Sequence, residues 1–112
     1  EVIADQLIDH FQARGVKRLY ISVDIDGTDE QYAAATGTPE SGGLPPWQVR
    51  SFIRHLGAAF PLAGADLVEV APSLSCDRPG EPELTLDTGL AYLEELGRLL
   101  RVELPAHDDD KA

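Results

Sequence analysis

The stretch that decides the fold is Arg18-Leu-Tyr-Ile-Ser-Val-Asp-Ile25, which is followed by Asp26. Its β-branched and aromatic residues are typical of a buried strand that is apolar on both faces. The stretch closes with an Asp-x-Asp pair, Asp24 and Asp26. Side chains two positions apart on a strand point to the same side, so both carboxylates can bind one hard cation or a pair of cations. The stretch therefore predicts a strand that ends at a metal site.

Helical and extended patterns alternate on either side of this strand. Apolar residues recur at helical spacing over residues 2–11, over 46–56 and over 84–100, and residues 67–72 indicate a second buried strand. Alternating helices and strands imply right-handed crossovers and a parallel sheet. The predicted fold class is α/β, a three-layer parallel sheet with helices on both faces. The stripe expected to face the core in the last helix comprises Leu86, Leu90, Leu93, Leu96, Leu99 and Leu100.

A long loop separates the first strand from the helix that follows it. Residues 27–46 are rich in Gly, Pro, Thr and Ala and carry no periodic pattern. Loops of this length seldom persist for packing alone. We expect this one to be functional.

Length and charge limit the classes of function. The chain has 112 residues, 43% of them hydrophobic, which suits one modest domain. Twenty acidic side chains against nine basic ones give a formal net charge of -11, which disfavours nucleic acid and anionic membranes as partners. No apolar run is long enough to span a bilayer, and we expect a cytoplasmic protein.

Two parallel strands do not form a self-sufficient sheet. We therefore expect residues 1–104 to be the C-terminal portion of a larger α/β enzyme, followed by an acidic tail at residues 105–112. Alone, the 112 residues are expected to be inactive.

Residues 23–28, Val-Asp-Ile-Asp-Gly-Thr, resemble the first motif of haloacid-dehalogenase-type phosphatases, which depend on magnesium. That resemblance implies a phosphoryl-accepting nucleophile at Asp24 and a general acid at Asp26. The later Lys and acidic pair that this family requires have no good counterpart, because the second strand offers only Glu69.

A second resemblance covers residues 16–100. The Asp-x-Asp stretch, then Ala-Thr-Gly-Thr-Pro-Glu-Ser-Gly-Gly-Leu at residues 35–44, then Val-Glu-Val-Ala-Pro at residues 68–72, is similar to the C-terminal part of the ureohydrolases. That family includes arginase, agmatinase and formimidoylglutamase. Three segments in the family's order favour it over the phosphatases.

The ureohydrolase resemblance implies a role for four residues. Asp24 would bridge two Mn²⁺ ions and Asp26 would bind one of them, while Glu69 would pair with the cationic group of the substrate and Thr38 would lie beside it. The remaining metal ligands would lie outside this chain. Each role has a structural alternative: the aspartates could be a solvated or N-capping pair, Glu69 could pair with a cation of the protein, and Thr38 could cap a turn.

The resemblance implies a metal-dependent hydrolase that attacks linear amidines or guanidines with a dimanganese-activated hydroxide and releases urea or formamide. The substrate would be a small cationic guanidino or formimino compound, and the protein a homo-oligomer, a trimer or hexamer. The phosphatase and a non-catalytic ureohydrolase homologue remain as alternatives. Glu30 and Ala34 stand where the family usually has proline, and we expect their loss to loosen the loop.

Overall fold

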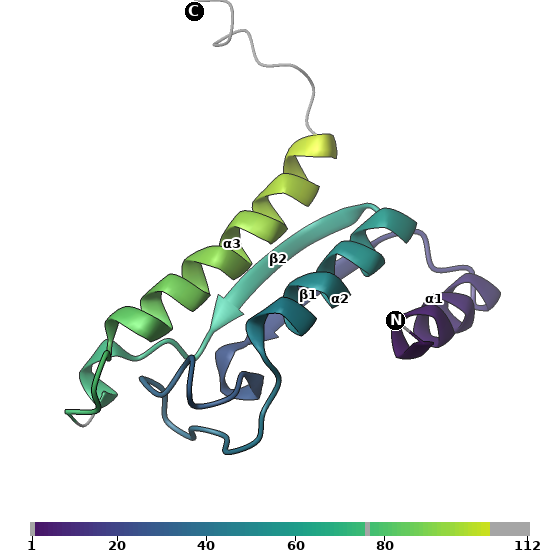
Figure 1. The fold of residues 1–112 in the computed structure, drawn as a ribbon. Coiled ribbons are helices and arrows are strands. Elements are labelled where there is room, and N and C mark those ends of the chain that lie inside the picture. Colours follow the sequence, from purple (N-terminus) through teal and green to yellow (C-terminus); the bar gives the residue numbers. More distant parts are fainter. Residues whose placement is uncertain (1, 76, 104–112) are drawn as a thin grey trace, which may run out of the picture.

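The computed structural model describes residues 2–75 and 77–103, and their side chains through residue 100. The predicted acidic tail, residues 105–112, lies outside the described residues. The elements are α1 (Val2–Ala13), β1 (Leu19–Asp24), α2 (Pro46–Ala59), β2 (Leu62–Val68) and α3 (Glu83–Glu103), with the short 3-10 turns η1 (Ile25–Gly27) and η2 (Pro72–Leu74) (Figure 1). All three predicted helices and both predicted strands are present.

β1 and β2 pair in parallel, with Ser22 opposite Asp66 and Asp24 opposite Val68. The prediction for the second strand was wrong in its bounds, because β2 begins at Leu62 and ends at Val68. The next residue, Glu69, has a φ of 72°, which turns the chain out of the extended conformation and ends the ladder. The loops that follow both strands consequently gather at one end of the sheet (Figure 1).

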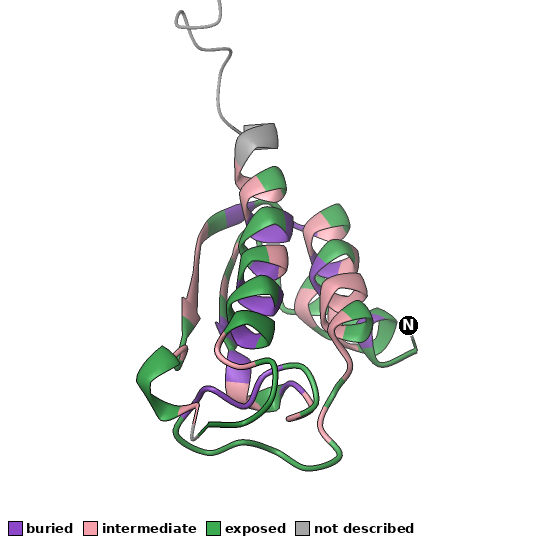
Figure 2. Cartoon of the chain, turned by 60° about the vertical axis from the view of Figure 1, so that its left-hand side comes forward, coloured by how far each residue is buried: buried purple, intermediate pink, exposed green. Residues whose placement is uncertain are grey.

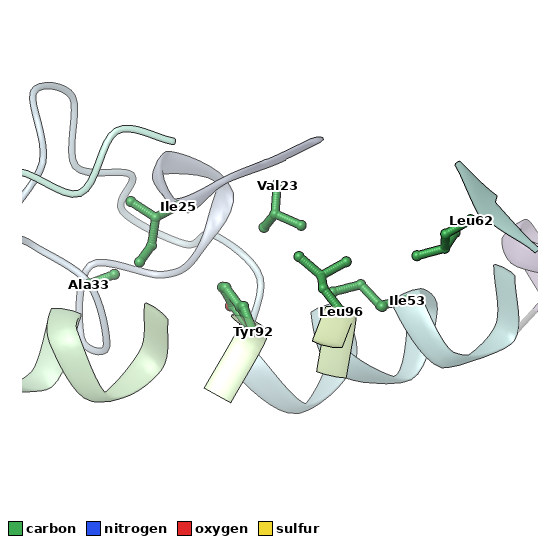
Figure 3. Packing of buried hydrophobic residues seen from close by; sticks show 7 residues of the cluster. All are labelled: Val23, Ile25, Ala33, Ile53, Leu62, Tyr92 and Leu96. Carbon is green, nitrogen blue, oxygen red and sulfur yellow. The ribbon is translucent and has the colours of Figure 1, made fainter. Parts of the chain in front are cut away.

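One face of this sheet carries the core. Side chains from β1 and the turn after it meet those of α2 and α3, and α1 packs through Phe11 against Phe60, with ring centroids 6.1 Å apart. Figure 3 shows Ile25 and Ala33 at one end of the cluster and Leu62 at the other. The buried members of the cluster are Val23, Ile25, Ala33, Ile53, Leu62, Tyr92 and Leu96.

The other face of β1 is polar, so the prediction of a strand that is apolar on both faces was wrong. Tyr20 is 62% exposed, and its hydroxyl donates to Asp66 Oδ2 over 2.8 Å. Ser22 donates its hydroxyl to Asp66 Oδ1 over 2.5 Å. These two hydrogen bonds lower the pKa of Asp66, and the bond to Asp66 raises the pKa of Tyr20. Cross-strand hydrogen bonds therefore join the two strands on this face.

The buried side of α3 differs from the predicted leucine stripe. Leu86, Leu90 and Leu93 are each about half exposed, whereas Leu96 is buried as predicted. Instead, several of the buried positions of α3, which are purple in Figure 2, hold polar residues. Those buried polar residues are Thr85, Thr88, Tyr92 (through its hydroxyl) and Glu95. Thr85 and Thr88 bond backbone groups of the long loop, which need hydrogen-bond partners where they are buried. Tyr92 pairs with the Thr28 hydroxyl.

Glu95 links α3 to α2. It is 2% exposed, and its Oε1 accepts from Arg54 Nη1 at 2.8 Å and Arg50 Nη2 at 3.0 Å, with Arg98 Nη1 at 3.5 Å. A buried carboxylate needs such partners, because an unpaired charge in the interior is costly.

Among the described residues, no helix is both long enough and apolar enough to cross a membrane.

Candidate metal centre

Asp24 and Asp26 lie on either side of a buried residue at the carboxyl end of β1. Asp24 is the last residue of the strand, and its Oδ1 accepts from the Asp26 N–H over 2.9 Å, which caps η1. Ile25 between them is fully buried. The expectation that one continuous strand presents both carboxylates was therefore wrong, because Asp26 belongs to the turn. The capping role of Asp24 is real, and it leaves the exposed carboxylate with further lone pairs.

Two hydroxyls of the long loop hold the Asp26 carboxylate. Thr36 donates its side-chain hydroxyl to Oδ1, and Thr38 donates its own to Oδ2. A carboxylate offers about four lone-pair positions, so both oxygens still have capacity for a cation. Hydrogen bonds of this kind orient a metal-binding carboxylate before the ion arrives.

The loop carrying these threonines is held by the beginning of α3. Glu81 Oε2 accepts from the Ala34 N–H over 2.6 Å, and Thr85 Oγ1 accepts from the Ala35 N–H over 3.0 Å. Glu81 Oε1 in turn accepts from the backbone N–H and the hydroxyl of Thr85 at 2.9 and 2.7 Å. This small network fixes the backbone immediately before Thr36.

The two positions without the family's proline both use the N–H that a proline lacks. Glu30 donates its N–H to the Glu40 carbonyl over 2.9 Å, and its carboxylate contacts Arg78 at 3.3 Å. Ala34 donates to Glu81, as described above. These hydrogen bonds hold the loop in place at the two positions where the loss of proline was expected to loosen it.

Glu69 follows β2 and is exposed, contrary to the expectation of a carboxylate within an apolar strand. The Ala71 N–H donates to the Ala35 carbonyl over 2.9 Å, which brings this segment against the loop. A Cβ added at Gly37 would stand 4.0 Å from Glu69 Oε2. Among the side chains that the structure describes, no Lys, Arg or His forms an ion pair with Glu69.

The four residues from the sequence analysis therefore gather at one end of the sheet, with Thr38 on Asp26 and Glu69 beside the loop. Within residues 2–75 and 77–103, no three His, Cys, Asp or Glu side chains come close enough together to hold a metal ion. The exposed carboxylate of Asp24 and the partly buried one of Asp26 are hard oxygen donors, which suit part of a manganese site. Asp24 and Asp26 can supply part of the ligands of a manganese site, and the other ligands must come from elsewhere.

Sequence reasoning missed the polar residues of α3 that support this centre. Thr85, Thr88 and Tyr92 follow one another at intervals of three and four, so they share one face of α3, and Glu81 lies just before the helix begins at Glu83. Thr88 donates its hydroxyl to the Tyr32 carbonyl over 3.0 Å. The spacing of these polar residues could have indicated the buried face of α3, but the leucine pattern of the same helix is more conspicuous.

Solved structures place this architecture in the arginase-like α/β class. Arginase from Bacillus caldovelox superposes with a TM-score of 0.70 at 28% identity, over 84% of this chain and 29% of that one. A hypothetical agmatinase from Burkholderia thailandensis gives a TM-score of 0.69 at 33% identity, over 88% of this chain and 30% of that one. These matches confirm the predicted fold class.

The arginase family model matches residues 1–96, and the chain belongs to that family. Mitochondrial agmatinase of Gallus gallus is 51% identical over 61 residues, which are 54% of this chain and 18% of the relative. Proclavaminate amidinohydrolase of Streptomyces clavuligerus is 43% identical over 91 residues, 80% of this chain and 28% of the relative. The ureohydrolase resemblance is confirmed, and the phosphatase interpretation was wrong. The chain spans less than a third of the length of each of these relatives.

Proposed function

We propose that the protein is a dimanganese hydrolase of small cationic guanidino compounds. In this proposal Asp24 and Asp26 bind the metal, and further ligands lie beyond the residues described. The observation that carries the proposal is the Asp26 carboxylate, held by Thr36 and Thr38 at the carboxyl end of a parallel strand. When bound, a pair of Mn²⁺ ions lowers the pKa of water and so supplies a nucleophile near neutral pH.

The residues of this chain would also recognise the substrate. A guanidinium is planar and matches a carboxylate through two parallel hydrogen bonds, so the exposed Glu69 is suited to hold it. Fixing the guanidinium plane presents its carbon for attack. Gly37 leaves room next to Glu69, because it has no side chain to fill that space. Thr38, expected beside the substrate, would support the site by orienting Asp26.

Relatives of this chain support a guanidino group as the common feature of the substrate. Besides agmatinase and proclavaminate amidinohydrolase, guanidinobutyrase of Pseudomonas aeruginosa is 50% identical over 54 residues, 48% of this chain and 17% of the relative. The products would be urea and an amine. A formimino substrate, which would release formamide, is the second candidate within the same chemistry.

The test is urea release by the intact protein from agmatine, guanidinobutyrate and arginine, and formamide release from formimidoylglutamate, with and without added Mn²⁺. We expect manganese-dependent turnover of a guanidino compound, and its loss in Asp24→Asn. Asp87→Asn, an exposed carboxylate on α3, is the matched control and should keep full activity. Absence of turnover with manganese bound would favour the non-catalytic homologue.

Two further expectations belong to the proposal. We propose a homo-oligomer, a trimer or hexamer, which analytical ultracentrifugation of the intact protein can test. We propose the cytoplasm as its compartment, although the matched agmatinase of Gallus gallus is named mitochondrial. Localisation of the tagged intact protein distinguishes the two.

A further inference from the structure

A buried hydroxyl pair joins α3 to the turn that carries the two aspartates. Tyr92 is 0% exposed and Thr28 is 1% exposed. Their hydroxyl oxygens are 2.7 Å apart, although the residues are 64 positions apart in the sequence. Thr28 is the residue directly after η1, two positions after Asp26.

The backbone around Thr28 closes the turn. The Thr28 N–H donates to the Ile25 carbonyl over 3.0 Å, which completes η1. On the other side, the Leu44 N–H donates to the Gly27 carbonyl over 2.9 Å, and the Asp29 N–H donates to the Leu44 carbonyl over 2.8 Å. A shift of Thr28 would therefore move the turn itself.

Ile25 provides a second attachment of the same turn to the core. It is fully buried in the cluster that contains Tyr92 (Figure 3). A Cβ added at Gly89 of α3 would stand 3.7 Å from Ile25 Cδ1. Asp24 precedes Ile25 and Asp26 follows it. The turn is thus held at Ile25 by packing and at Thr28 by the hydroxyl pair.

Packing alone does not require these hydroxyls. A phenylalanine and a valine would fill nearly the same space, and burying a hydroxyl costs free energy unless it is hydrogen-bonded. Burial raises the pKa of Tyr92, so its hydroxyl stays protonated at neutral pH. A paired hydroxyl adds what apolar contacts lack, a fixed direction and distance between α3 and the turn.

We propose that Tyr92 is a positioning residue of the candidate metal centre, which through Thr28 fixes η1 and sets the placement of the Asp24 and Asp26 carboxylates. The geometry stands independently of the metal. Its consequence for metal binding rests on the proposed function. Metal sites need their ligands held to within about 0.5 Å, so a looser turn should weaken binding.

The first experiment is hydrogen exchange of the intact protein, with Tyr92→Phe and Thr28→Val compared with the wild type. We expect exchange in the peptide covering residues 24–29 to be about tenfold faster in both variants, the effect of losing one buried hydrogen bond. The double variant should be no faster than either single one. Thr28→Ser keeps the hydroxyl and should restore slow exchange. Unchanged exchange in the turn, or an equal increase throughout α3, would overturn the proposal.

The second experiment is Mn²⁺ titration of the same variants, followed by the loss of the free-ion signal in electron paramagnetic resonance. We expect Tyr92→Phe to weaken binding about tenfold, within the range for groups that orient metal ligands. If Asp26→Asn abolishes binding and Tyr92→Phe leaves it unchanged, the positioning role is refuted and the proposed function stands. If the wild type binds no manganese, the proposed function fails and the exchange comparison alone decides for or against Tyr92.

Discussion

Thr36 donates its hydroxyl to the carboxylate of Asp26, ten positions earlier in the chain, and thereby ties the long loop to the end of β1. Thr36 is buried, so its hydroxyl has little freedom to turn elsewhere. Thr36→Val keeps the shape and removes the donor. We expect Mn²⁺ affinity of the intact protein to fall about 10-fold to 100-fold, as for other groups that orient metal ligands. Thr36→Ser, which keeps the hydroxyl, is the control, and an equal loss in both variants would contradict this role.

Ala34→Pro should destabilise the protein, even though proline is usual in the family at this position. The substitution removes the N–H that donates to Glu81 over 2.6 Å and leaves a partly buried carboxylate oxygen without that partner. We expect a loss of about 1–3 kcal/mol in the free energy of unfolding, measured with urea. Ala34→Ser keeps the N–H and serves as the comparison. A gain in stability for Ala34→Pro would show that the hydrogen bond contributes less than the stiffer backbone.

Gly43 and Gly97 should respond in opposite directions to alanine. A Cβ at Gly43 would stand 2.8 Å from the Asp29 backbone nitrogen and 2.9 Å from the Gly27 carbonyl oxygen, so the loop would have to move. We expect Gly43→Ala to lower the free energy of unfolding by about 1–3 kcal/mol. Gly97 lies within α3 with nothing within 4 Å of the added atom, and Gly97→Ala should stabilise by up to about 1 kcal/mol through helix propensity. Urea unfolding checks both, and similar changes of one sign would contradict the steric account.

Glu95→Ala should destabilise more than Arg98→Ala, although the two side chains contact each other. Glu95 is buried and receives all three arginines, whereas Arg98 is mostly exposed and lies 3.5 Å away. We expect Glu95→Ala to lower the free energy of unfolding by about 1–3 kcal/mol, because its partners lose a hydrogen-bonded anion. Arg98→Ala should lower it by less than about 0.5 kcal/mol. Comparable losses in urea unfolding would mean that the exposed arginine contributes as much as the others.

Stability should fall at acid pH partly through Asp66. Its folded pKa lies below the ordinary aspartate value, because Ser22 and Tyr20 donate to its carboxylate. The stabilisation that Asp66 contributes is therefore fully present above the pKa of the unfolded state, and it is lost as the pH falls through the pKa of the folded state. Ser22→Ala should flatten this part of the profile of unfolding free energy against pH. Ser73→Ala, exposed in η2, should leave the profile unchanged, and an unaltered profile in Ser22→Ala would refute the assignment.

The helices and strands could be predicted well from the sequence, but which of their sides are buried could be predicted less well. The helices follow strong periodic patterns and β1 is rich in β-branched and aromatic residues, and local sequence specifies both. The strand β2 was misplaced because Ala63-Gly64-Ala65-Asp66 has weak strand propensity and is held extended by its pairing with β1. The inward side of α3 was misassigned because leucines were expected to face the core. Its true neighbour there is a loop whose N–H and carbonyl groups select hydrogen-bonding side chains.

The candidate site was predictable to a similar extent. The resemblance to the ureohydrolases indicated Asp24, Asp26, Thr38 and Glu69, and the structure brings their segments together. Neither composition nor spacing could show that Asp26 lies in a turn, since Asp-x-Asp is compatible with both a strand and a turn. Tyr92 was unpredictable for another reason. Its partner Thr28 is distant in sequence, and only the packed fold reveals the pair.

The hydrogen bonds from Glu81, Thr85, Thr88 and Tyr92 to the long loop have a consequence for folding. A loop without regular structure would ordinarily open by itself, at a free-energy cost far below that of global unfolding. Here residues 33–36 are buried. The Ala35 N–H donates to Thr85 of α3, Thr88 of α3 donates to the Tyr32 carbonyl, and the Ala34 N–H donates to Glu81 just before the helix. Loop and helix should therefore open together as one cooperative unit, so that the irregular segment carrying the site has the lifetime of α3.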